Sequence, residues 1–319
     1  MLLGNYDAEK ISSETRLPLI HMNKPGEKTE LRGALKHAES MSGHTSWRTG
    51  GMADEYFEPA DLEDLCNYLV SLSDDRQILW LGLGSNLLVR DGGFHGSVIA
   101  YSKGLNRIEK LTDGIFHIEA GVPCAKVARF TAKAGYTGGE FLAGIPGTVG
   151  GALAMNAGAF GGETWNVVNK VKTVDRKGEL RERTRSEFVI AYRSVAVPGE
   201  EWFVSAEIEL AIDHEKNAER CIRELLDKRS ESQPTGLPSC GSVFRNPAGD
   251  YAGRLIEHCG LKGKKIGGAI ISEKHGNFII NTGNATSEDI ESLILLAQKT
   301  VQELCNVTLV PEVKIVGNE

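Results

Sequence analysis

The sequence predicts a mixed α+β protein organised in two or three domains. At 319 residues the chain is longer than a single hydrophobic core usually organises. Short apolar runs typical of strands alternate with segments of helical periodicity, and no internal repeat of fixed period is present. Two glycine-rich segments, residues 81–89 and 144–163, interrupt this alternation. Apolar residues lie among their glycines, which indicates closely packed loops rather than flexible linkers.

The composition is that of an ordinary soluble protein, with 41% hydrophobic and 25% charged residues. A net charge of −7 argues against nucleic acid as a partner, because proteins that bind nucleic acid usually present a basic face. An anionic small molecule remains compatible, since a few local arginines suffice to hold a phosphate. The six cysteines show no C-x-x-C spacing, which favours reduced thiols over a metal site or a disulfide framework. With no signal-like segment and no membrane span visible, the sequence predicts a cytoplasmic protein.

The first part of the chain predicts an extension followed by a helix and a strand. Residues 1–42 are polar and lack sustained periodicity, as in an N-terminal extension. A helix is expected at about 61–73, because Asp61 suits the N-cap and the leucines that follow share one face. The apolar residues 78–81 predict a buried strand that ends in the first glycine-rich segment.

Short strands are expected within residues 97–120, with a turn at Asp113-Gly114. A helix should follow at about 125–134, where Gly135 is a natural residue to end it. Strand-like runs then occupy residues 167–175 and 202–212, on either side of a charged stretch at 176–187.

The polar stretch 213–217 predicts a domain boundary, followed by a helix whose apolar residues share one face. Strands are expected at 266–271 and 278–280, the first weakened by a pair of glycines. A long helix should run from about 287 to 304, opened by Thr286 or Ser287, and a strand at 308–316 should close the chain.

The two glycine-rich segments predict a site for a dinucleotide. Glycine has no Cβ to hold a ligand away, and it adopts positive φ, so successive N–H groups can point toward a phosphate. Tight turns that pack strands together are the alternative reading of both segments. Neither segment has the G-x-G-x-x-G spacing followed by a helix, and no P-loop motif occurs in the chain, which argues against phosphoryl transfer.

Five motifs in order resemble the UDP-N-acetylenolpyruvoylglucosamine reductases, the MurB family of flavoenzymes, and together they span roughly residues 43–316. They are Gly82-Leu83-Gly84-Ser85-Asn86, then Gly144-Ile145-Pro146-Gly147 with Asn156-Ala157-Gly158-Ala159, then Tyr192-Arg193-Ser194, Cys240 to Pro247, and Pro311-Glu312-Val313. The resemblance implies an FAD-binding domain of the vanillyl-alcohol oxidase and p-cresol methylhydroxylase type, with two α/β lobes, over residues 43–213. A C-terminal α/β substrate-binding domain is implied over residues 214–319.

The resemblance also implies FAD as the cofactor and NADPH as the hydride donor. Neither glycine-rich segment contains a histidine that could tether the flavin, so FAD should be bound non-covalently. The residues expected to bind it are Gly82, Leu83, Gly84, Ser85, Asn86, Leu87, Gly144, Ile145, Pro146, Gly147, Thr148, Gly150, Gly151, Met155, Asn156, Gly158 and Ala159.

Three residues are expected to be catalytic by the same resemblance. Taken alone, Arg193 reads as a surface arginine over Tyr192, Ser242 as a turn residue, and Glu312 as a solvent-facing carboxylate. The resemblance instead places Arg193 near the substrate carboxylate, where a guanidinium can steady growing negative charge. It makes Ser242 the proton donor and has Glu312 help to stabilise an enol intermediate.

The implied substrate is UDP-N-acetylglucosamine enolpyruvate, which hydride from flavin N5 would convert to UDP-N-acetylmuramate, a cell-wall precursor. Tyr192, Arg229 and Asn246 are expected to bind it, with Lys274 and His275 as weaker candidates. Only residues 195–201 separate the Tyr-Arg motif from the next strand, which resembles the shorter class of the family that lacks a tyrosine-bearing lid.

Two other functions remain open at this stage. A flavin oxidase or dehydrogenase of the same fold could act on another small alcohol or sugar, and a binding protein could keep the nucleotide fold without redox function. Cys240 departs from the alanine expected beside the serine motif, which predicts a packing thiol and raises the question of oxidation at the site.

Overall fold

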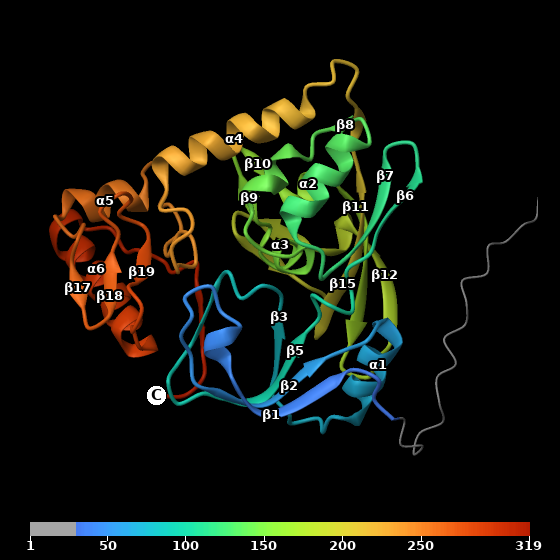
Figure 1. The fold of residues 1–319 in the computed structure, drawn as a ribbon, viewed down its shortest axis with the longest axis horizontal. Coiled ribbons are helices and arrows are strands. Elements are labelled where there is room, and N and C mark those ends of the chain that lie inside the picture. The colour runs from blue at the N-terminus through green and yellow to red at the C-terminus, as the bar shows by residue number, and fades with distance from the viewer. Residues whose placement is uncertain (1–29) are drawn as a thin grey trace, which may run out of the picture. The chain divides into compact units, whose positions relative to one another are not determined.

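The computed structural model describes residues 30–319 of the chain (Figure 1). Of the predicted N-terminal extension, residues 1–29 lie outside the described part. Within the rest of it, β1 (Ala34–Ser40) pairs antiparallel with β2 (Met52–Glu58), with a short 3-10 turn (Met41–Gly43) between them. This part of the predicted extension is therefore an integral sheet strand.

The first sheet has four strands in the order β1-β2-β5-β3, where β5 is Phe94–Ala100 and β3 is Ile78–Leu81. Strands β2 and β3 both run parallel to β5, so β3 and β5 end at the same edge of the sheet. In parallel sheets ligands bind beyond the carboxyl ends of the strands. The first glycine-rich segment follows β3 at that edge.

Helix α1 (Leu62–Ser71) connects β2 to β3, and its start is the one that the sequence predicts. The Asp61 carboxylate accepts a hydrogen bond from the backbone N–H of Asp64 at 3.0 Å, which caps the helix. Leu65 and Leu69 are fully buried and belong to the hydrophobic cluster that joins the first sheet to the second. The helix ends at Ser71 rather than at residue 73.

The second sheet is antiparallel and has five strands in the order β12-β11-β15-β7-β6. Their bounds are β6 (Ile108–Thr112), β7 (Ile115–Glu119), β11 (Val168–Asp175), β12 (Leu180–Thr184) and β15 (Glu201–Glu209). Four of them lie where the sequence predicts strands. Strand β12 lies in the charged stretch 176–187, where the sequence predicts no strand. Its residues Arg181 and Arg183 can lie in the sheet because they form ion pairs with the buried carboxylate of Glu201.

Helices α2 (Cys124–Lys133) and α3 (Val149–Met155) share the hydrophobic cluster of the second sheet, together with α4 (Ala218–Ser232). The predicted end of α2 is confirmed, since Gly135 follows it with a φ of +86°. Small strand pairs complete this region: β8 (Tyr136–Thr137) with β16 (Ala211–Ile212), β9 (Gly158–Ala159) with β10 (Gly162–Glu163), and β13 (Val189–Ala191) with β14 (Ser194–Ala196).

The C-terminal part contains a three-stranded antiparallel sheet, β17 (Lys265–Ile266), β18 (Ala269–Ile271) and β19 (Ile279–Asn281). Helices α5 (Ala252–His258) and α6 (Ser287–Cys305) pack with it in one hydrophobic cluster. The predicted long helix is confirmed, and Thr286 and Asp289 form a capping box at its start. Every helix of residues 30–319 is too short or too polar to cross a lipid bilayer.

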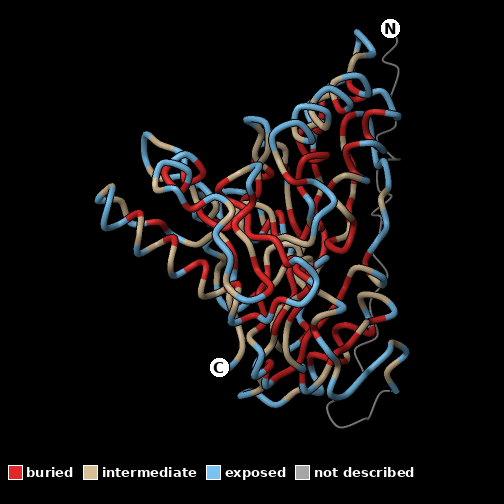
Figure 2. The backbone as a smooth tube through the Cα atoms, turned by 60° about the vertical axis from the view of Figure 1, so that its left-hand side comes forward, coloured by how far each residue is buried: buried red, intermediate tan, exposed pale blue. Residues whose placement is uncertain are grey.

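The end of the chain returns to the first glycine-rich segment. Strand β20 (Lys314–Val316) pairs in parallel with β4 (Leu87–Val89), the last part of that segment. Only this short strand is regular within the predicted strand 308–316, although Pro311 forms an isolated bridge with Phe244. Figure 2 shows the buried positions gathered in the interior and the exposed positions on turns and outer helix faces.

Trp47 joins the N-terminal part of the chain to the C-terminal cluster and is fully buried there. Its indole N–H donates to the carbonyl of Ile279 at 2.7 Å, and the Asn281 amide donates to the carbonyl of Trp47 at 2.7 Å. We expect Trp47→Phe to lower the free energy of unfolding by about 1–3 kcal/mol, because it leaves a buried acceptor without its donor. Urea unfolding measures the loss.

Trp80→Phe is the matched control for that variant. The indole N–H of Trp80 is buried without an acceptor in residues 30–319, so its removal should leave stability unchanged or raise it. An equal loss from both substitutions would show that ring volume, and not the hydrogen bond of Trp47, accounts for the effect.

Candidate functional site

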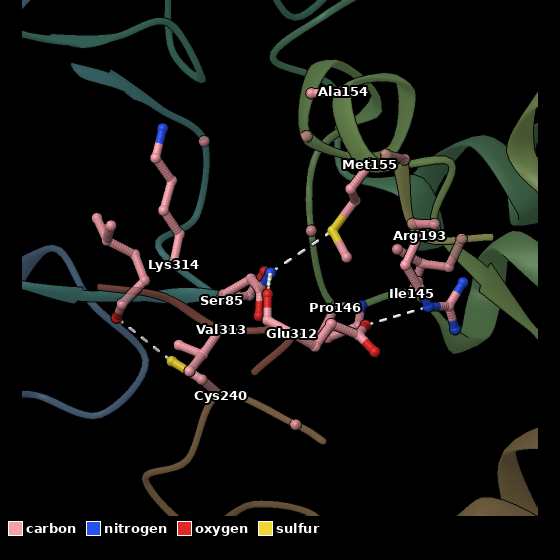
Figure 3. A pocket seen from close by; sticks show the side chains of 18 of the residues that line it. Ser85, Ile145, Pro146, Ala154, Met155, Arg193, Cys240, Glu312, Val313 and Lys314 are labelled. Atoms are coloured by element: carbon pink, nitrogen blue, oxygen red, sulfur yellow. Dashed lines mark hydrogen bonds and ion pairs between the residues drawn. The ribbon is translucent and has the colours of Figure 1, made fainter. Parts of the chain in front are cut away.

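One cavity of about 870 Å³ gathers nearly all the residues that the sequence singles out. It lies at the large end of the roughly 300–1,000 Å³ range of small-molecule sites. Its walls come from both glycine-rich segments, the β13–β14 turn, the segment around Ser242 and the segment before β20. Figure 3 shows how the side chains from these separate elements converge. All the predicted site residues line the cavity except Asn156 and the two weaker candidates, Lys274 and His275.

The two glycine-rich segments meet each other in the wall of the cavity. A Cβ on Gly82 would lie 2.4 Å from Oγ1 of Thr148, and a Cβ on Gly147 would lie 3.2 Å from the hydroxyl of Ser85. Larger residues would therefore force the segments apart. Gly84 has a φ of +60°, and a Cβ there would lie 2.0 Å from the carbonyl oxygen of His44. Close packing therefore requires glycine at positions 82 and 84, and the sequence reading of packed loops is confirmed.

Backbone donors in these segments are available to a ligand. The N–H groups of Ser85, Asn86 and Gly147 donate to no acceptor in the described part of the chain. The first N–H groups of α3 are already used, since Val149 donates to the carbonyl of Val122 at 2.9 Å and Gly150 to that of Ala120 at 2.8 Å. A phosphate would thus be held by the loop N–H groups rather than by the helix terminus.

Asn156, a predicted cofactor-binding residue, does not line the cavity. It ends α3 with a φ of +45° and is buried, and its amide group bonds inside the protein. The amide N–H donates to the Glu163 carboxylate at 2.9 Å, and the amide oxygen accepts from the backbone N–H of Trp165 at 3.2 Å. The Asn156 side chain therefore holds the second glycine-rich segment in its conformation through these hydrogen bonds and does not reach the cavity.

Arg193 lies at the tip of the β13–β14 hairpin with a φ of +55°, a conformation that is strained for a residue with a side chain. Its guanidinium donates to the carbonyls of Gly158 at 2.8 Å and Asn156 at 3.3 Å. Gly158 has to be a glycine, because a Cβ there would lie 2.4 Å from the carbonyl oxygen of Gly162, and it would also crowd the guanidinium at 3.1 Å. These contacts direct Arg193 into the cavity.

Glu312 faces Arg193 within the cavity (Figure 3). Nε of Arg193 lies 3.1 Å from Oε1 of Glu312, an ion pair in which the N–H does not point at the carboxylate. Burial raises the pKa of the Glu312 carboxyl and outweighs the opposing effect of the charges of Arg193 and Arg245. The amide of Asn86 donates to the backbone carbonyl of Glu312 at 2.9 Å, which fixes the segment to the first glycine-rich loop.

Ser242 is half-buried and lines the same cavity, and its hydroxyl makes no hydrogen bond to residues 30–319. It is therefore available to a ligand. Cys240 lies behind it, where the thiol donates to the carbonyls of Leu87 at 3.5 Å and Gly84 at 3.7 Å. Burial raises the pKa of this thiol to about 12. These contacts agree with the packing role that the sequence predicts for Cys240.

The predicted substrate-binding residues divide into two groups. Tyr192, Arg229 and Asn246 line the cavity, whereas Lys274 and His275 do not. Arg229 donates from Nε to Gln233 at 2.9 Å and from Nη1 to the carbonyl of Gly144, and burial lowers the pKa of its guanidinium. The Asn246 side-chain oxygen accepts from Ala252 at the start of α5. Lys274, outside the cavity wall, donates from its ammonium group to the carbonyl of Ser230.

The structure adds cavity residues to which sequence reasoning assigned no role. Tyr101 is buried at the carboxyl end of β5, and a Cβ on Gly150 would lie 2.7 Å from its hydroxyl. Its position beyond a parallel strand is a signal that could have identified it. Arg245 lies inside a recognised motif, but nothing in the sequence shows that its side chain reaches the cavity.

The charge of the cavity suits an anionic ligand. Its two carboxylates are both paired: Glu312 with Arg193, and Glu201 with Arg183, whose hydrogen bonds lower the pKa of Glu201 to about 2. Arg229, Arg245 and Lys314 have no carboxylate partner in residues 30–319, and of the three only Arg229 has side-chain hydrogen bonds there. Within the same residues there is no cluster of three or more side chains that could hold a metal ion.

Comparison with known proteins agrees with this site. The family model described as UDP-N-acetylenolpyruvoylglucosamine reductase, C-terminal domain, matches residues 233–316, and the model described as FAD binding domain matches residues 53–184. The UDP-N-acetylenolpyruvoylglucosamine reductase of Methylococcus capsulatus is 54% identical over 286 residues, which cover 90% of this chain and 94% of that protein. The reductase of Nitrosococcus oceani is also 54% identical, over 90% of this chain and 96% of its own length.

A solved structure gives the same result for the fold. The crystal structure of the reductase from Thermus caldophilus superimposes with a TM-score of 0.77 at 31% sequence identity. The match covers 89% of this chain and 98% of that one. The FAD-binding fold that the sequence predicts is thereby confirmed. The close-packed glycines and the unused loop N–H groups of the cavity fit this cofactor.

Proposed function

This chain belongs to the UDP-N-acetylenolpyruvoylglucosamine reductase family of FAD-dependent oxidoreductases, and we propose that it uses NADPH to reduce UDP-N-acetylglucosamine enolpyruvate to UDP-N-acetylmuramate, a precursor of peptidoglycan. The observation that carries this proposal is the meeting of Arg193, Glu312 and Ser242 in the cavity that both glycine-rich segments line. These residues come from three distant parts of the chain, and neither an oxidase nor a simple binding protein explains all three.

The glycine-rich segments would hold the cofactor in this proposal. The free N–H groups of Ser85, Asn86 and Gly147 would bind its phosphates, and the absence of side chains at Gly82 and Gly84 allows the close approach. FAD bound there would supply the redox chemistry, the transfer of hydride from the nicotinamide to the substrate. The protein supplies binding, orientation and electrostatics.

The catalytic residues would act on the enolpyruvyl end of the substrate. Negative charge develops on the carbon that bears the carboxylate when the distal vinyl carbon gains hydride. Arg193 would steady this charge from a fixed position, since two carbonyls and Glu312 orient its guanidinium. Glu312, with its raised pKa, would stabilise the enol form by hydrogen bonding. Ser242 would then protonate the carbon from its unbonded hydroxyl.

The reaction itself tests the substrate assignment. With NADPH and UDP-N-acetylglucosamine enolpyruvate, we expect one nicotinamide to be oxidised for each product molecule, and mass spectrometry should find the product heavier by two hydrogen atoms. UDP-N-acetylglucosamine is the matched control, because it lacks the vinyl group that accepts the hydride. Oxidation of NADPH that depends only on oxygen, and not on the enolpyruvate, would instead indicate an oxidase.

The proposed role of Glu312 predicts a pH dependence. A raised pKa keeps the carboxyl protonated above its ordinary range of about 4.3, and the protonated fraction falls as the pH rises through the shifted value. The rate of flavin reoxidation by the enolpyruvate should therefore fall with rising pH in the wild type. Arg193 and Arg245 are the charged groups that face Glu312, and arginine stays charged throughout this range.

The variants Glu312→Gln and Glu312→Ala distinguish a role of Glu312 as a hydrogen-bond donor from a role of its carboxylate charge. Glutamine keeps a hydrogen-bond donor at every pH, so this variant should lose the pH dependence of reoxidation and stay more active than the alanine variant. Stopped-flow mixing of the reduced flavoproteins with the enolpyruvate measures the rate of flavin reoxidation for wild type and both variants across the pH range. A pH profile unchanged from wild type in Glu312→Gln would assign the titration to another group.

A further inference from the structure

Arg245 is the one arginine in the cavity wall whose side chain has no partner in residues 30–319. Its Nε is buried and lacks an acceptor, and its guanidinium forms no ion pair with a described carboxylate. The other cavity arginines are engaged: Arg193 with Glu312 and two carbonyls, and Arg229 with Gln233 and the Gly144 carbonyl. Arg245 is thus a cation that the protein alone does not satisfy.

The backbone around Arg245 is firmly held. Its N–H donates to the carbonyl of Val310 at 2.9 Å, and Phe244 before it is bound on both sides by the Asn277 amide, at 2.9 Å and 2.8 Å. Phe244 also bridges to Pro311, the residue before Glu312. Arg245 therefore starts from a fixed point beside the Glu312 carboxylate. Burial raises the pKa of Glu312, and the charge of Arg245 opposes part of that rise.

A guanidinium in this situation is a receptor for an anion. Leaving a buried donor unsatisfied is unfavourable, and a planar guanidinium binds carboxylate or phosphate oxygens through two parallel hydrogen bonds. Lys314, the other unpaired cation of the cavity wall, is exposed and remains hydrated without a ligand. Arg245 is the better placed of the two to bind an anionic group that enters the cavity.

We infer that Arg245 binds an anionic oxygen group of the substrate, either its diphosphate or its carboxylate, and so positions the enolpyruvyl end beside Ser242 and Glu312. This inference rests on the proposed function of the cavity. It assigns Arg245 to the substrate and not to FAD, because Arg245 belongs to the C-terminal segment that carries Ser242, whereas the glycine-rich segments are the proposed seat of the cofactor.

The test is ligand binding to purified flavoprotein carrying Arg245→Gln, Arg245→Lys or the control Arg254→Gln. Arg254 is also an arginine of the C-terminal part, but it is exposed, pairs with Asp250 and lies outside the cavity wall. Flavin absorbance reports binding of UDP-N-acetylglucosamine enolpyruvate, and competition reports binding of UDP-N-acetylglucosamine, which has the diphosphate without the carboxylate. We expect Arg245→Gln to weaken enolpyruvate binding by about 10- to 100-fold.

The lysine variant should recover only part of this loss, since an ammonium cannot form the paired hydrogen bonds of a guanidinium. Weaker binding of both ligands identifies the diphosphate as the partner of Arg245, and weaker binding of the enolpyruvate alone identifies the carboxylate. Flavin content and the rate of flavin reduction by NADPH should match those of Arg254→Gln in either case.

Two results would overturn the inference. Wild-type affinity of Arg245→Gln for both ligands would show that the guanidinium does not bind the substrate. Loss of flavin, or equally slowed flavin reduction by NADPH, would show that Arg245 serves the cofactor or the fold. Failure of the proposed function is a separate outcome, because wild-type protein would then fail to transfer hydride to the enolpyruvate whatever residue stands at position 245.

Discussion

Ser242→Ala should slow the reduction of the enolpyruvate by about 10²- to 10⁴-fold, the usual contribution of a positioned general acid. The hydroxyl lines the cavity and makes no hydrogen bond within residues 30–319, so its removal creates no unpaired group and no large void. Reduction of the flavin by NADPH requires no proton from Ser242. We therefore expect this first half-reaction to keep its wild-type rate, which rapid-mixing absorbance measures separately from the second.

Ser239→Ala is the control for this variant, because Ser239 lies in the same segment but outside the cavity wall. It should leave both half-reactions unchanged. If Ser242→Ala also retains both rates, the proton comes from another group. If both half-reactions slow together, the substitution has disturbed the cofactor seat instead of the chemistry.

Gly84→Ala should strip the protein of FAD and destabilise it strongly. Gly84 has a φ of +60°, where a side chain is unfavourable by roughly 1–2 kcal/mol. The larger effect is steric, because the new Cβ would lie 2.0 Å from the carbonyl oxygen of His44, which is backbone and cannot swing away. The segment that carries Ser85 and Asn86 would have to move, and with it the N–H groups proposed for the phosphates.

The ratio of flavin to protein after purification and the midpoint of urea unfolding measure the two effects. Gly135→Ala is the matched control: Gly135 also has a positive φ, of +86°, but nothing lies within 4 Å of the added Cβ. The Gly135→Ala variant should retain FAD, and its free energy of unfolding should fall only by the cost of a side chain at positive φ. Equal behaviour of the two variants would mean that close packing at Gly84 does not shape the cofactor site.

The glycine-rich loops could be predicted from sequence because few other residues permit their geometry. Positive φ and a close approach such as that of Gly82 to Thr148 exclude side chains. The pattern of glycines in the sequence therefore indicates where the loops are closely packed. The start of α6 could also be predicted from sequence, because the capping residues Thr286 and Asp289 act within a single helical turn. Local physics determines both features.

The meeting of Arg193 with Glu312 could not be derived from local pattern. It depends on the parallel pairing of β20 with β4 and on the β13–β14 hairpin, and only the family resemblance placed the two residues in one site. Arg245 illustrates the same limit, because its role depends on the absence of partners in the folded structure.

Two features that the sequence reading did not anticipate have a common physical cause. The amide of Asn156 stands in a glycine-rich loop and reads as a ligand-binding group, but Glu163 and Trp165 bind it from behind. Strand β12 was not predicted because of its charges, which Glu201 balances from β15, on the other side of β11. In both places the direction of a polar side chain is set by contacts that form only in the folded chain, and periodicity does not record them.

The most direct test of the proposed function is anaerobic. The purified flavoprotein is first bleached with NADPH, UDP-N-acetylglucosamine enolpyruvate is then added, and the flavin absorbance is followed. We predict rapid return of the oxidised-flavin bands, with UDP-N-acetylmuramate formed in equal amount. A flavin that is reduced but stays bleached with the enolpyruvate present would contradict the substrate assignment while leaving the fold and the cofactor intact.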